Sequence, residues 1–554
     1  MTSQAKATSQ PTAARRLVET LVANGTTHVF CVPGESYLAV LDALYDFKDQ
    51  IEVVTCRHEA GAANMAVAYG KLTGKAGICF VTRGPGATHG SIGVHTAQQD
   101  SVPMIYFVGQ VARGDKGREA FQEVDYAAAF GPLCKLAFEI DDPTRTVELC
   151  TKAFATAQQG RKGAVVVALP EDMLVESAGP RIPAPVANVQ SGLDPNFLAA
   201  LAKRLEAAER PVLVLGGTGW NEESLRVLTK WVEGLGLPVV LSFRRKDLLD
   251  NAHACYIGDI GLAPNPKLIQ RLKSADLVIS IGARLGENPS QAYTLMTPEE
   301  SAAKLVHIHP DPQELNRVWP TSLAAACDAS GAAKGIAGLA VRRSWANTPW
   351  LGEARAELEA FTTPVPVTGK VNLSEMFTAL AKTLKADAII ANGAGNYAGW
   401  LHRFFPHRSF GTQLAPTSGA MGFGFPAAVA AKIMYPNRQV VAVAGDGCFL
   451  MTAQELATAV QYNANLITIV VDNGSYGTIR MHQERDFPNR VSATDLVNPD
   501  FAAFARSFGA FAVTVDRTDA FAAAFEQASK AGKPALIHVK TSVADIAPGK
   551  TITP

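Results

Sequence analysis

The sequence lacks the features that mark several large classes of protein. Lys and Arg together equal Asp and Glu, at 51 each, so no net charge favours binding to nucleic acid or to an anionic membrane. No apolar run is long enough to span a bilayer. The first fourteen residues, MTSQAKATSQPTAA, lack the apolar core of a signal peptide. The sequence therefore predicts a soluble cytoplasmic protein that acts on small molecules.

Cysteine patterns that would hold a metal or a disulfide framework are also missing. The eight cysteines are scattered through apolar segments, with no CxxC pair and no histidine cluster at zinc spacing. Buried free thiols in a reducing compartment are the expected state. A chain of 554 residues is long enough for about three domains, each with its own core.

A strand, helix and strand unit between residues 439 and 477 is the most informative stretch that is present. One β-branched apolar run ends in a GDG turn that contains Asp446, and a second ends in a DNG turn that contains Asn473. Parallel strands of such a unit are often adjacent, so both side chains are expected at the carboxyl edge of a sheet, where α/β sheets bind ligands. Neighbouring strands lie about 4.8 Å apart, which lets two side-chain oxygens share a small cation.

The surroundings of Asp446 favour an anionic ligand that a cation holds in place. Its neighbouring glycines allow close backbone approach, and a helix that opens after Cys448 offers free N–H groups. The predicted ligand is a magnesium-held phosphate or diphosphate. Asp-Gly and Asn-Gly are also common turn dipeptides, so the alternative interpretation is that each pair only closes a loop.

The two turns together resemble the signature of thiamin diphosphate enzymes, which holds the magnesium diphosphate. The family doublet is usually Asn-Asn, whereas this chain has Asp472-Asn473, and the second position is the metal ligand. The resemblance implies that Asp446, Asn473 and the backbone oxygen of Ser475 bind magnesium. It also implies that both turns contact the cofactor. The residues concerned are Gly445, Asp446, Gly447, Cys448, Asn473, Ser475, Tyr476 and Gly477.

Glu59 follows the strand-like segment IEVVTC and opens a helix of small residues. A carboxylate at the end of a strand faces a dry setting there, although an acidic residue in a first turn also serves simply to stabilise the helix dipole. RHE before such a helix resembles the segment that carries the activating glutamate of the same family. A carboxyl group bonded to the distal nitrogen of the aminopyrimidine favours the imino tautomer, which is the catalytic role implied for Glu59.

Further segments match this family in the same order along the chain. GICFVTRGPGAT matches its strand and Gly-rich turn, and the earlier Pro-Gly turn at Gly34 is assigned to cofactor binding. AFQEVD resembles the acetolactate synthase branch, in which the glutamine lies near the thiazolium ring of the cofactor. This resemblance implies that Gln122 is a catalytic residue and that Phe121 lies beside it at the substrate.

Two loops of the C-terminal third complete the implied cofactor site. Asn396 and Tyr397 align with a family segment that touches the diphosphate from a second loop. TSGAMGFGFPAA matches the stretch that passes beneath the aminopyrimidine. By this resemblance the Gly419 carbonyl and the Met421 amide would bond the ring, and the Met421 side chain would wedge between the two rings of the cofactor.

The segment after the DNG turn is expected to cover the site; its sequence is TIRMHQERDFPNR. Acetolactate synthases carry a tryptophan here that favours a 2-oxo acid as acceptor, and the equivalent position in this chain is His482. We predict that Ile479 and His482 contact the substrate. The alternative for His482 is a solvated histidine of a lid.

The predicted fold is α/β, with three domains that each contain a mostly parallel sheet flanked by helices. A flexible tail (1–14) precedes a pyrimidine-binding domain (15–180), a central domain (190–345) and a diphosphate-binding domain (368–554), with Pro-rich linkers between them. In acetolactate synthases the central domain carries FAD. CYIGDIGLAPNP and GARLGE depart from the corresponding segments of those proteins, which makes FAD doubtful here.

We therefore predict a magnesium- and thiamin diphosphate-dependent enzyme that decarboxylates a 2-oxo acid, with carboligation as in acetolactate synthases. Glu59 and Asp446 would grip opposite ends of one ligand. In the family this happens across a subunit interface, so a homodimer or homotetramer is implied, with no nucleic acid or membrane partner. The alternatives are a 2-hydroxyacyl-CoA or acyloin carbon–carbon lyase and a non-catalytic cofactor-binding relative, which would have no need of Glu59.

Overall fold

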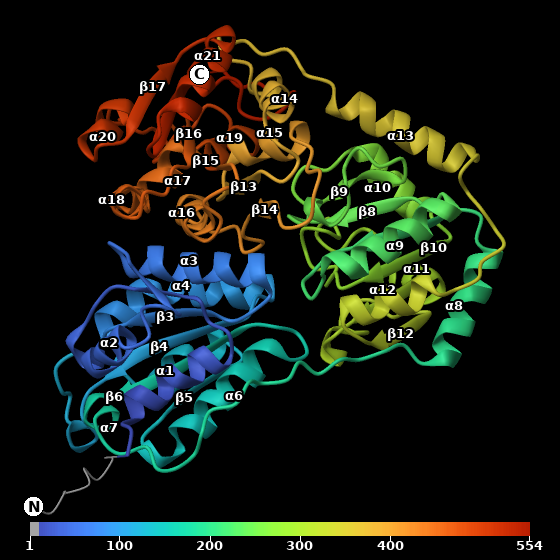
Figure 1. Ribbon diagram of the computed structural model, residues 1–554. Coiled ribbons are helices and arrows are strands. Elements are labelled where there is room, and N and C mark those ends of the chain that lie inside the picture. The colour runs from blue at the N-terminus through green and yellow to red at the C-terminus, as the bar shows by residue number, and fades with distance from the viewer. Residues whose placement is uncertain (1–9, 554) are drawn as a thin grey trace, which may run out of the picture. The chain divides into compact units, whose positions relative to one another are not determined.

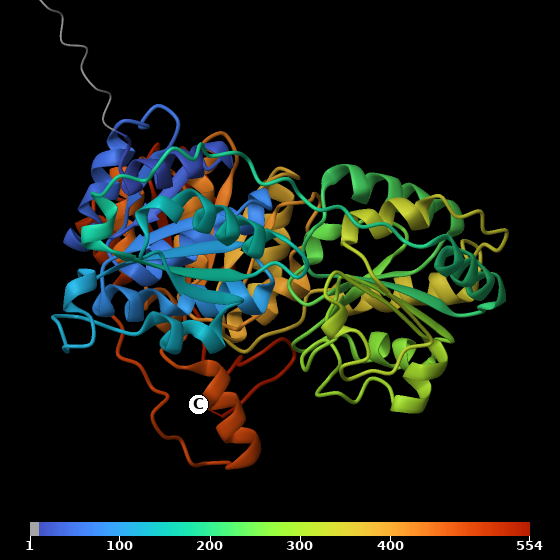
Figure 2. The ribbon, with the colours of Figure 1, turned by 90° about the horizontal axis from the view of Figure 1, so that it is seen from below.

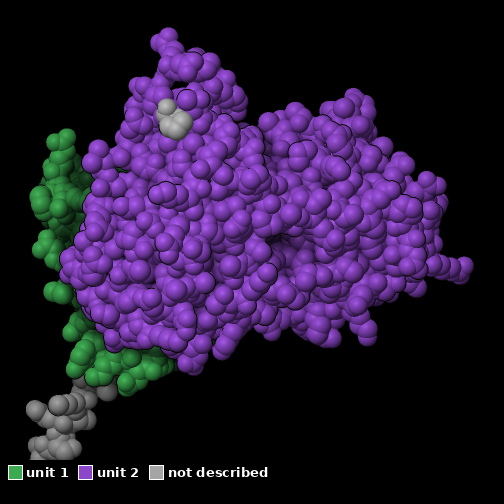
Figure 3. Space-filling view, turned by 90° about the horizontal axis from the view of Figure 1, so that it is seen from above, with its two compact units in different colours: residues 1–189 green, residues 190–554 purple. Residues whose placement is uncertain are grey.

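The computed structural model describes residues 10–553, and this part of the chain forms three α/β domains (Figure 1). It divides into two compact units, residues 1–189 and residues 190–554 (Figure 3). Three six-stranded sheets carry the described residues, and within each sheet every neighbouring pair of strands is parallel. The predicted fold class is therefore confirmed. In the described ranges no helix is both long enough and apolar enough to cross a membrane.

The first sheet has the strand order β2-β1-β3-β4-β6-β5. Its strands are β1 (His28–Cys31), β2 (Glu52–Thr55), β3 (Gly77–Val81), β4 (Met104–Gln110), β5 (Leu136–Glu139) and β6 (Ala164–Pro170). Its helices are α1 (Ala13–Ala23), α2 (Leu38–Tyr45), α3 (Glu59–Thr73), α4 (Gly84–Asp100), α5 (Tyr126–Phe130), α6 (Thr146–Gln158) and α7 (Glu171–Leu174). Large apolar side chains of α1, α2 and α6 form the core on one face of this sheet.

Two helices of small residues, α3 and α4, pack side by side in this unit (Figure 1). Gly93 of α4 lies so close to Ala63 of α3 that an added Cβ would stand 2.3 Å from the Cβ of Ala63. The spacing of small residues along both helices makes this approach possible. It matters for the site, because Glu59 is the first residue of α3 and the Gly-rich turn leads into α4.

Gly93→Ala is expected to destabilise the first unit by about 1–3 kcal/mol, because the added methyl group would collide with the Ala63 backbone as well as with its side chain. The gain in helix propensity, about 1 kcal/mol, does not offset a clash that only a shift of a whole helix relieves. Denaturant unfolding monitored by circular dichroism would measure the loss. Gly114→Ala is the control, since no atom lies within 4 Å of an added Cβ there. Equal midpoints for the two variants would contradict the prediction.

The second sheet has the order β12-β11-β10-β7-β8-β9 and belongs to the central domain. Its strands are β7 (Pro211–Leu215), β8 (Val239–Ser242), β9 (Tyr256–Ile260), β10 (Leu277–Ile281), β11 (Leu305–His309) and β12 (Leu323–Ala326). The helices are α8 (Pro195–Ala207), α9 (Glu222–Leu235), α10 (Pro266–Ser274), α11 (Pro298–Lys304), α12 (Ala329–Ala337) and α13 (Pro349–Thr362). Separate apolar clusters cover the two faces of this sheet.

The third sheet has the order β14-β13-β15-β16-β18-β17, which repeats the order of the first. Its strands are β13 (Ile389–Asn392), β14 (Gln413–Leu414), β15 (Val440–Gly445), β16 (Ile467–Asp472), β17 (Phe511–Val515) and β18 (Ala535–Lys540). Its helices are α14 (Leu373–Thr383), α15 (Asn396–Phe404), α16 (Gly424–Met434), α17 (Asp446–Leu450), α18 (Leu456–Gln461), α19 (Gly477–Asp486), α20 (Phe501–Ser507) and α21 (Phe521–Lys530).

The structure differs from the sequence-based expectations in two places. The helix of the strand, helix and strand unit between residues 439 and 477 begins at Asp446, not after Cys448, so the GDG turn is itself the first turn of a short helix. Residues 1–9 of the predicted tail lie outside the described residues, and α1 begins at Ala13, inside that predicted tail. The domain boundaries themselves stay predictions.

Candidate functional site

The GDG and DNG turns lie side by side at the carboxyl edge of the third sheet. The strands β15 and β16 are adjacent, with Gly445 paired to Val471, so the residues that follow them emerge next to each other. The Asp446 carboxylate is buried, and its Oδ1 accepts a hydrogen bond of 2.9 Å from the Gly447 amide. Its Oδ2 accepts one of 3.0 Å from the Gly474 amide. The predicted adjacency of the two turns is thus present in the structure.

A second carboxylate, Asp472, stands beside Asp446 because it ends β16. The Asn498 side chain bridges the pair, since its Nδ2 donates to Asp446 Oδ2 and to Asp472 Oδ1, each over 2.8 Å. The Gly474 amide also contacts both residues, at 3.0 Å each. His538 of β18 completes the group, with its Nε2 2.8 Å from Asp472 Oδ2. Two acidic groups are therefore held together by donors from three segments of the chain.

The two carboxyl groups differ in their readiness to ionise. Burial raises the pKa of Asp446 to about 6, against the hydrogen bonds from the Gly447 amide and Asn498. Burial acts in the same direction on Asp472, but hydrogen bonds from His538, Asn498 and the Gly474 amide outweigh it and hold its pKa at about 2. A cation at this edge would offset the negative charge of the two carboxylates, so the pair fits a divalent metal.

Oxygen atoms of the kind that magnesium prefers as ligands surround Asp446. Asn473 Oδ1 accepts a hydrogen bond from the Ser475 amide at 3.1 Å, and the Ser475 carbonyl accepts one from the Gly477 amide at 2.8 Å. Each of these oxygens has a second lone pair that a metal ion can use. The Ser475 hydroxyl donates to the Thr494 carbonyl at 3.0 Å, so the backbone oxygen of Ser475 is the better candidate ligand than its side chain. The residues present therefore fit a magnesium ion.

The loop after β13 contacts the same turns. Asn396 Nδ2 lies 3.3 Å from the Gly477 carbonyl, and Thr478 donates to Asn396 Oδ1 over 2.9 Å. The Tyr397 hydroxyl accepts from the Gly393 amide at 3.0 Å and lies 3.4 Å from Cys448 Sγ. Burial raises the pKa of Tyr397 far above its usual value, so the ring stays neutral. The structure thus brings the two predicted diphosphate-binding loops together.

Several glycines allow the close packing of the loops around the GDG and DNG turns. An added Cβ at Gly445 would lie 2.9 Å from the Tyr397 ring, and one at Gly447 would lie 2.6 Å from the Tyr476 ring. Gly419 has a φ of +71°, in the left-handed region that favours glycine. Met421, two residues on, is half-buried against the domain core.

The predicted covering segment forms α19, which Figure 2 shows near the C-terminus of the chain. Ile479 is 54% exposed, so an apolar side chain is open to solvent close to the DNG turn. His482 is half-buried, and its Nδ1 has no hydrogen-bond partner among the described residues. Arg480 fastens the helix, since it pairs with Glu484 at 2.8 Å and donates to the Thr553 carbonyl.

Glu59 lies in the first unit, at the N-terminus of α3, and its side chain is only 12% exposed. His58 caps the helix, because its Nδ1 accepts from the Ala60 amide at 3.0 Å. His89 Nδ1 lies 3.0 Å from Glu59 Oε2, and the rings of His58 and His89 stack with centroids 4.8 Å apart. The ligand atoms of the three side chains all lie within 4.8 Å of one another.

The other predicted residues of this unit lie around the neighbouring strand ends. A Cβ at Gly34 would stand 2.5 Å from Thr82 Cβ, so the turns after β1 and β3 are in contact. Gln122 has a φ of +65°, and its carbonyl accepts from the Gly84 amide at 3.0 Å. Phe121 is 73% exposed.

The predicted residues thus form two groups, one in each compact unit. Sequence reasoning missed four residues. His89 contacts Glu59 and His58 stacks on His89, whereas Asn498 contacts both Asp446 and Asp472, and His538 contacts Asp472. RHE and GPGATH contain the first two, but nothing in their spacing indicates that the rings meet. Asn498 and His538 come from segments far along the chain, and only the fold brings them to Asp446 and Asp472.

Asn498→Ala is expected to weaken binding of a divalent cation about 10- to 100-fold, because it removes the amide that orients Asp446, the predicted metal ligand. Titration with Mn²⁺, followed by the electron paramagnetic resonance of the free ion, would measure the affinity. Asn465→Ala is the matched control, since the Asn465 amide donates to the Gly532 carbonyl at the surface. Equal Mn²⁺ affinities in the two variants would contradict an orienting role for Asn498.

The carboxyl edge of the central sheet is occupied by contacts within the chain. An added Cβ at Gly217 would lie 2.1 Å from the Gly282 carbonyl, so the loops after β7 and β10 touch. Arg245 also donates to the Gly217 carbonyl. The Trp220 indole donates to the Gly216 carbonyl at 2.8 Å.

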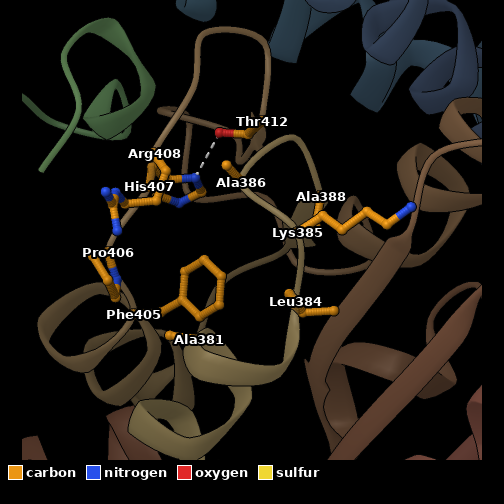
Figure 4. Close-up of a pocket in the computed structure, with 10 residues that line it drawn as sticks. All are labelled: Ala381, Leu384, Lys385, Ala386, Ala388, Phe405, Pro406, His407, Arg408 and Thr412. Atoms are coloured by element: carbon orange, nitrogen blue, oxygen red, sulfur yellow. Dashed lines mark hydrogen bonds between the residues drawn. The ribbon is translucent and has the colours of Figure 1, made fainter.

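A small pocket lies elsewhere in the C-terminal domain (Figure 4). It is lined by Ala381, Leu384, Lys385, Ala386, Ala388, Phe405, Pro406, His407, Arg408 and Thr412. His407 Nδ1 is 3.0 Å from Thr412 Oγ1 across it. None of the predicted site residues lines this pocket, so it has no part in the candidate site.

Comparison with known proteins defines the class to which this site belongs. The family model described as "Thiamine pyrophosphate enzyme, N-terminal TPP binding domain" matches residues 11–129. Those described as the central domain and the C-terminal TPP binding domain of these enzymes match residues 198–336 and 393–539. Thiamine pyrophosphate is another name for thiamin diphosphate, so one match falls on each of the three α/β domains, in the predicted order.

Similarity over nearly the full length identifies the branch. The acetolactate synthase large subunit of Parasynechococcus marenigrum is 31% identical over 543 residues, which span 95% of this chain and 87% of that protein. A probable acetolactate synthase large subunit of Methanocaldococcus jannaschii is 31% identical (97% and 93%), and the acetolactate synthase of Bacillus subtilis is 30% identical (98% and 95%). The chain belongs to the thiamin diphosphate enzymes. It is an acetolactate synthase-like member of that family, as the motifs predict.

Proposed function

We propose that the chain decarboxylates a 2-oxo acid and joins the remaining carbonyl unit to a second carbonyl compound, with thiamin diphosphate and Mg²⁺ as cofactors. The observation that carries this proposal is the pair of adjacent turns with Asp446 and Asn473, in a chain similar to acetolactate synthases over nearly its full length. When bound, thiamin diphosphate supplies a nucleophilic carbon for the 2-oxo group. The carbon–carbon lyase alternative is not favoured by these relatives.

Asp446, Asn473 and the Ser475 carbonyl are the proposed magnesium ligands. Their turns are fixed by hydrogen bonds before a metal arrives, so little order has to be created on binding. Asn396 and the amides of the GDG turn are proposed to receive the diphosphate. The glycines of these turns leave the close approach that an anion needs.

Glu59 is proposed to activate the cofactor at its aminopyrimidine end, with the Met421 segment supporting the folded arrangement of the two rings. Gln122 and Phe121 are proposed to face the reacting carbon, and Ile479 and His482 to contact the substrate. Glu59 and Asp446 lie in separate units, so the proposal requires the first unit of one chain to meet the second unit of the same or of a partner chain. A homodimer or homotetramer with sites between subunits fulfils it.

Two further parts of the proposal concern FAD and location. FAD is doubtful, because two segments of the central domain, CYIGDIGLAPNP and GARLGE, depart from the corresponding stretches of the acetolactate synthases. A cytoplasmic location is supported by the eight free cysteines, all of them buried. We propose no nucleic acid or membrane partner, in keeping with the equal numbers of acidic and basic residues.

A panel of 2-oxo acids tests the reaction. The purified protein, supplied with Mg²⁺ and thiamin diphosphate, is expected to release carbon dioxide from at least one of them and to form a ligated product when a second 2-oxo acid or an aldehyde is added. Chelation with EDTA and dialysis should abolish the release, and Mg²⁺ with the cofactor should restore it. Cleavage of a 2-hydroxyacyl-CoA or an acyloin without carbon dioxide would overturn the proposed reaction.

A further inference from the structure

A histidine of α4 contacts the carboxyl group that is proposed to activate the cofactor. His89 Nδ1 lies 3.0 Å from Glu59 Oε2, and the two residues come from different helices. The Glu59 side chain is 12% exposed, whereas that of His89 is 55% exposed. An ionised carboxylate has only acceptor atoms, so Nδ1 of His89 is the donor when Glu59 is ionised. The bond therefore ties a buried carboxylate to a ring that stands nearer the surface.

The ring of His89 is also held from its flat side. It stacks on His58, with centroids 4.8 Å apart and an angle of 28° between the planes. His58 is itself fixed, because its Nδ1 caps α3 through the Ala60 amide. Burial lowers the pKa of His58, which favours a neutral ring there. The orientation of His89 is thus set by two contacts, a hydrogen bond to Glu59 and ring stacking on His58.

The hydrogen bond distinguishes the two oxygens of the Glu59 carboxyl group. Oε2 is engaged by His89, whereas Oε1 lies toward Gly86, where an added Cβ would stand 3.4 Å away. Gly86 has no side chain, so none packs against Oε1 from this position. The close packing of α3 against α4 at Gly93 fixes the distance between the helices that carry the two partners.

We propose that His89 is a positioning residue for Glu59, which holds Oε2 so that Oε1 is presented to the aminopyrimidine nitrogen of thiamin diphosphate. The inference rests on the proposed function, since it assigns a role in the activation of that cofactor. Rotation of the Glu59 side chain would otherwise spread its oxygens over several orientations. Fixing one oxygen leaves the other in a single direction, which is the pre-organisation that proton sharing with a ring nitrogen requires.

The test compares His89→Ala, His89→Asn and wild type in the full-length protein. In His89→Ala, exchange of the acidic proton of bound thiamin diphosphate is expected to slow at least about tenfold, as the loss of a hydrogen bond to a charged group predicts. The near-ultraviolet circular dichroism of the bound cofactor should shift away from the imino tautomer. His89→Asn should restore both signals in part, because its side-chain amide can donate to Oε2.

Two controls separate positioning from general damage. His95→Ala removes a second histidine of α4, which is half-buried and for which the described contacts include no bond to Glu59, and should leave exchange and spectrum unchanged. In a Glu59→Gln background, His89→Ala should add no further loss, because both changes act on one interaction. An additive loss would overturn the inference.

The outcome also distinguishes this inference from the proposed function. If the wild-type protein binds thiamin diphosphate but neither exchanges its proton nor releases carbon dioxide, the proposed function fails. If the wild type does both and His89→Ala matches it in exchange rate and in spectrum, only the role of His89 is refuted. Binding of the cofactor, measured by calorimetry for each variant, shows whether a lost signal comes from lost cofactor.

Discussion

Glu59→Gln is expected to slow exchange of the acidic proton of bound thiamin diphosphate at least about 100-fold and to reduce carbon dioxide release to a similar extent. General acid–base groups contribute about 10²–10⁴-fold to a rate, and glutamine keeps the shape of glutamate without its exchangeable carboxyl proton. Glu59 is suited to this role because it is nearly buried and is oriented from a neighbouring helix by His89.

Glu59→Gln keeps the size of the side chain, so structural damage would not explain such a loss of activity. The amide oxygen of the introduced glutamine could still accept a hydrogen bond from His89, so the local packing should persist. Glu52→Gln provides the matched control, since Glu52 lies on β2 and pairs with His28 at 3.5 Å instead of with the site. Equal exchange rates in wild type and Glu59→Gln would remove Glu59 from the mechanism.

Asp446→Asn is expected to weaken Mn²⁺ or Mg²⁺ binding at least about 100-fold and to abolish binding of thiamin diphosphate at micromolar concentration. The substitution removes the charge of the buried carboxylate that is proposed to bind the metal directly, which is a larger change than the loss of a residue that only orients a ligand. Electron paramagnetic resonance of Mn²⁺ and calorimetry with thiamin diphosphate would measure the two affinities.

Asp472→Asn is the informative control for this prediction. It removes the neighbouring negative charge but leaves an oxygen that can accept from Asn498 and from the Gly474 amide, and an amide that can donate to His538. It also restores the Asn-Asn doublet that is usual in the family. We expect Asp472→Asn to retain cation binding to within about tenfold. Strong loss in Asp472→Asn with retention in Asp446→Asn would show that the metal is assigned to the wrong carboxylate.

The wild-type network explains how two acidic groups are tolerated side by side. Asn498 and the Gly474 amide donate to both, and His538 approaches the far oxygen of Asp472. Such donors lower the pKa of Asp472 and so leave a fixed negative charge behind the proposed metal ligand. A neutral family doublet would lack this charge, so the site of this chain differs electrostatically from the usual pattern even where its ligands agree.

Much of the fold follows from local sequence patterns. Buried parallel strands are short apolar runs in the sequence, and glycine and acidic residues directly after such a run indicate the turn that follows the strand. The unit around Asp446 was predictable for this reason, because strand, helix and strand lie within forty residues or so of each other. The strands β5, β12 and β14 carry weaker signals: β14 spans only Gln413–Leu414, and the side chains of β5 and most of β12 are half-buried.

The sequence by itself determined the α/β class, the motif residues Glu59, Asp446 and Asn473, and the resemblance that names the cofactor. Each depends on residues close together in the chain, where spacing translates directly into geometry. The tertiary structure alone decided which groups surround these carboxylates: His89 beside Glu59, and Asn498 and His538 beside Asp446 and Asp472. Those partners come from other strands and helices, and their distance in space depends on packing, which local periodicity does not encode.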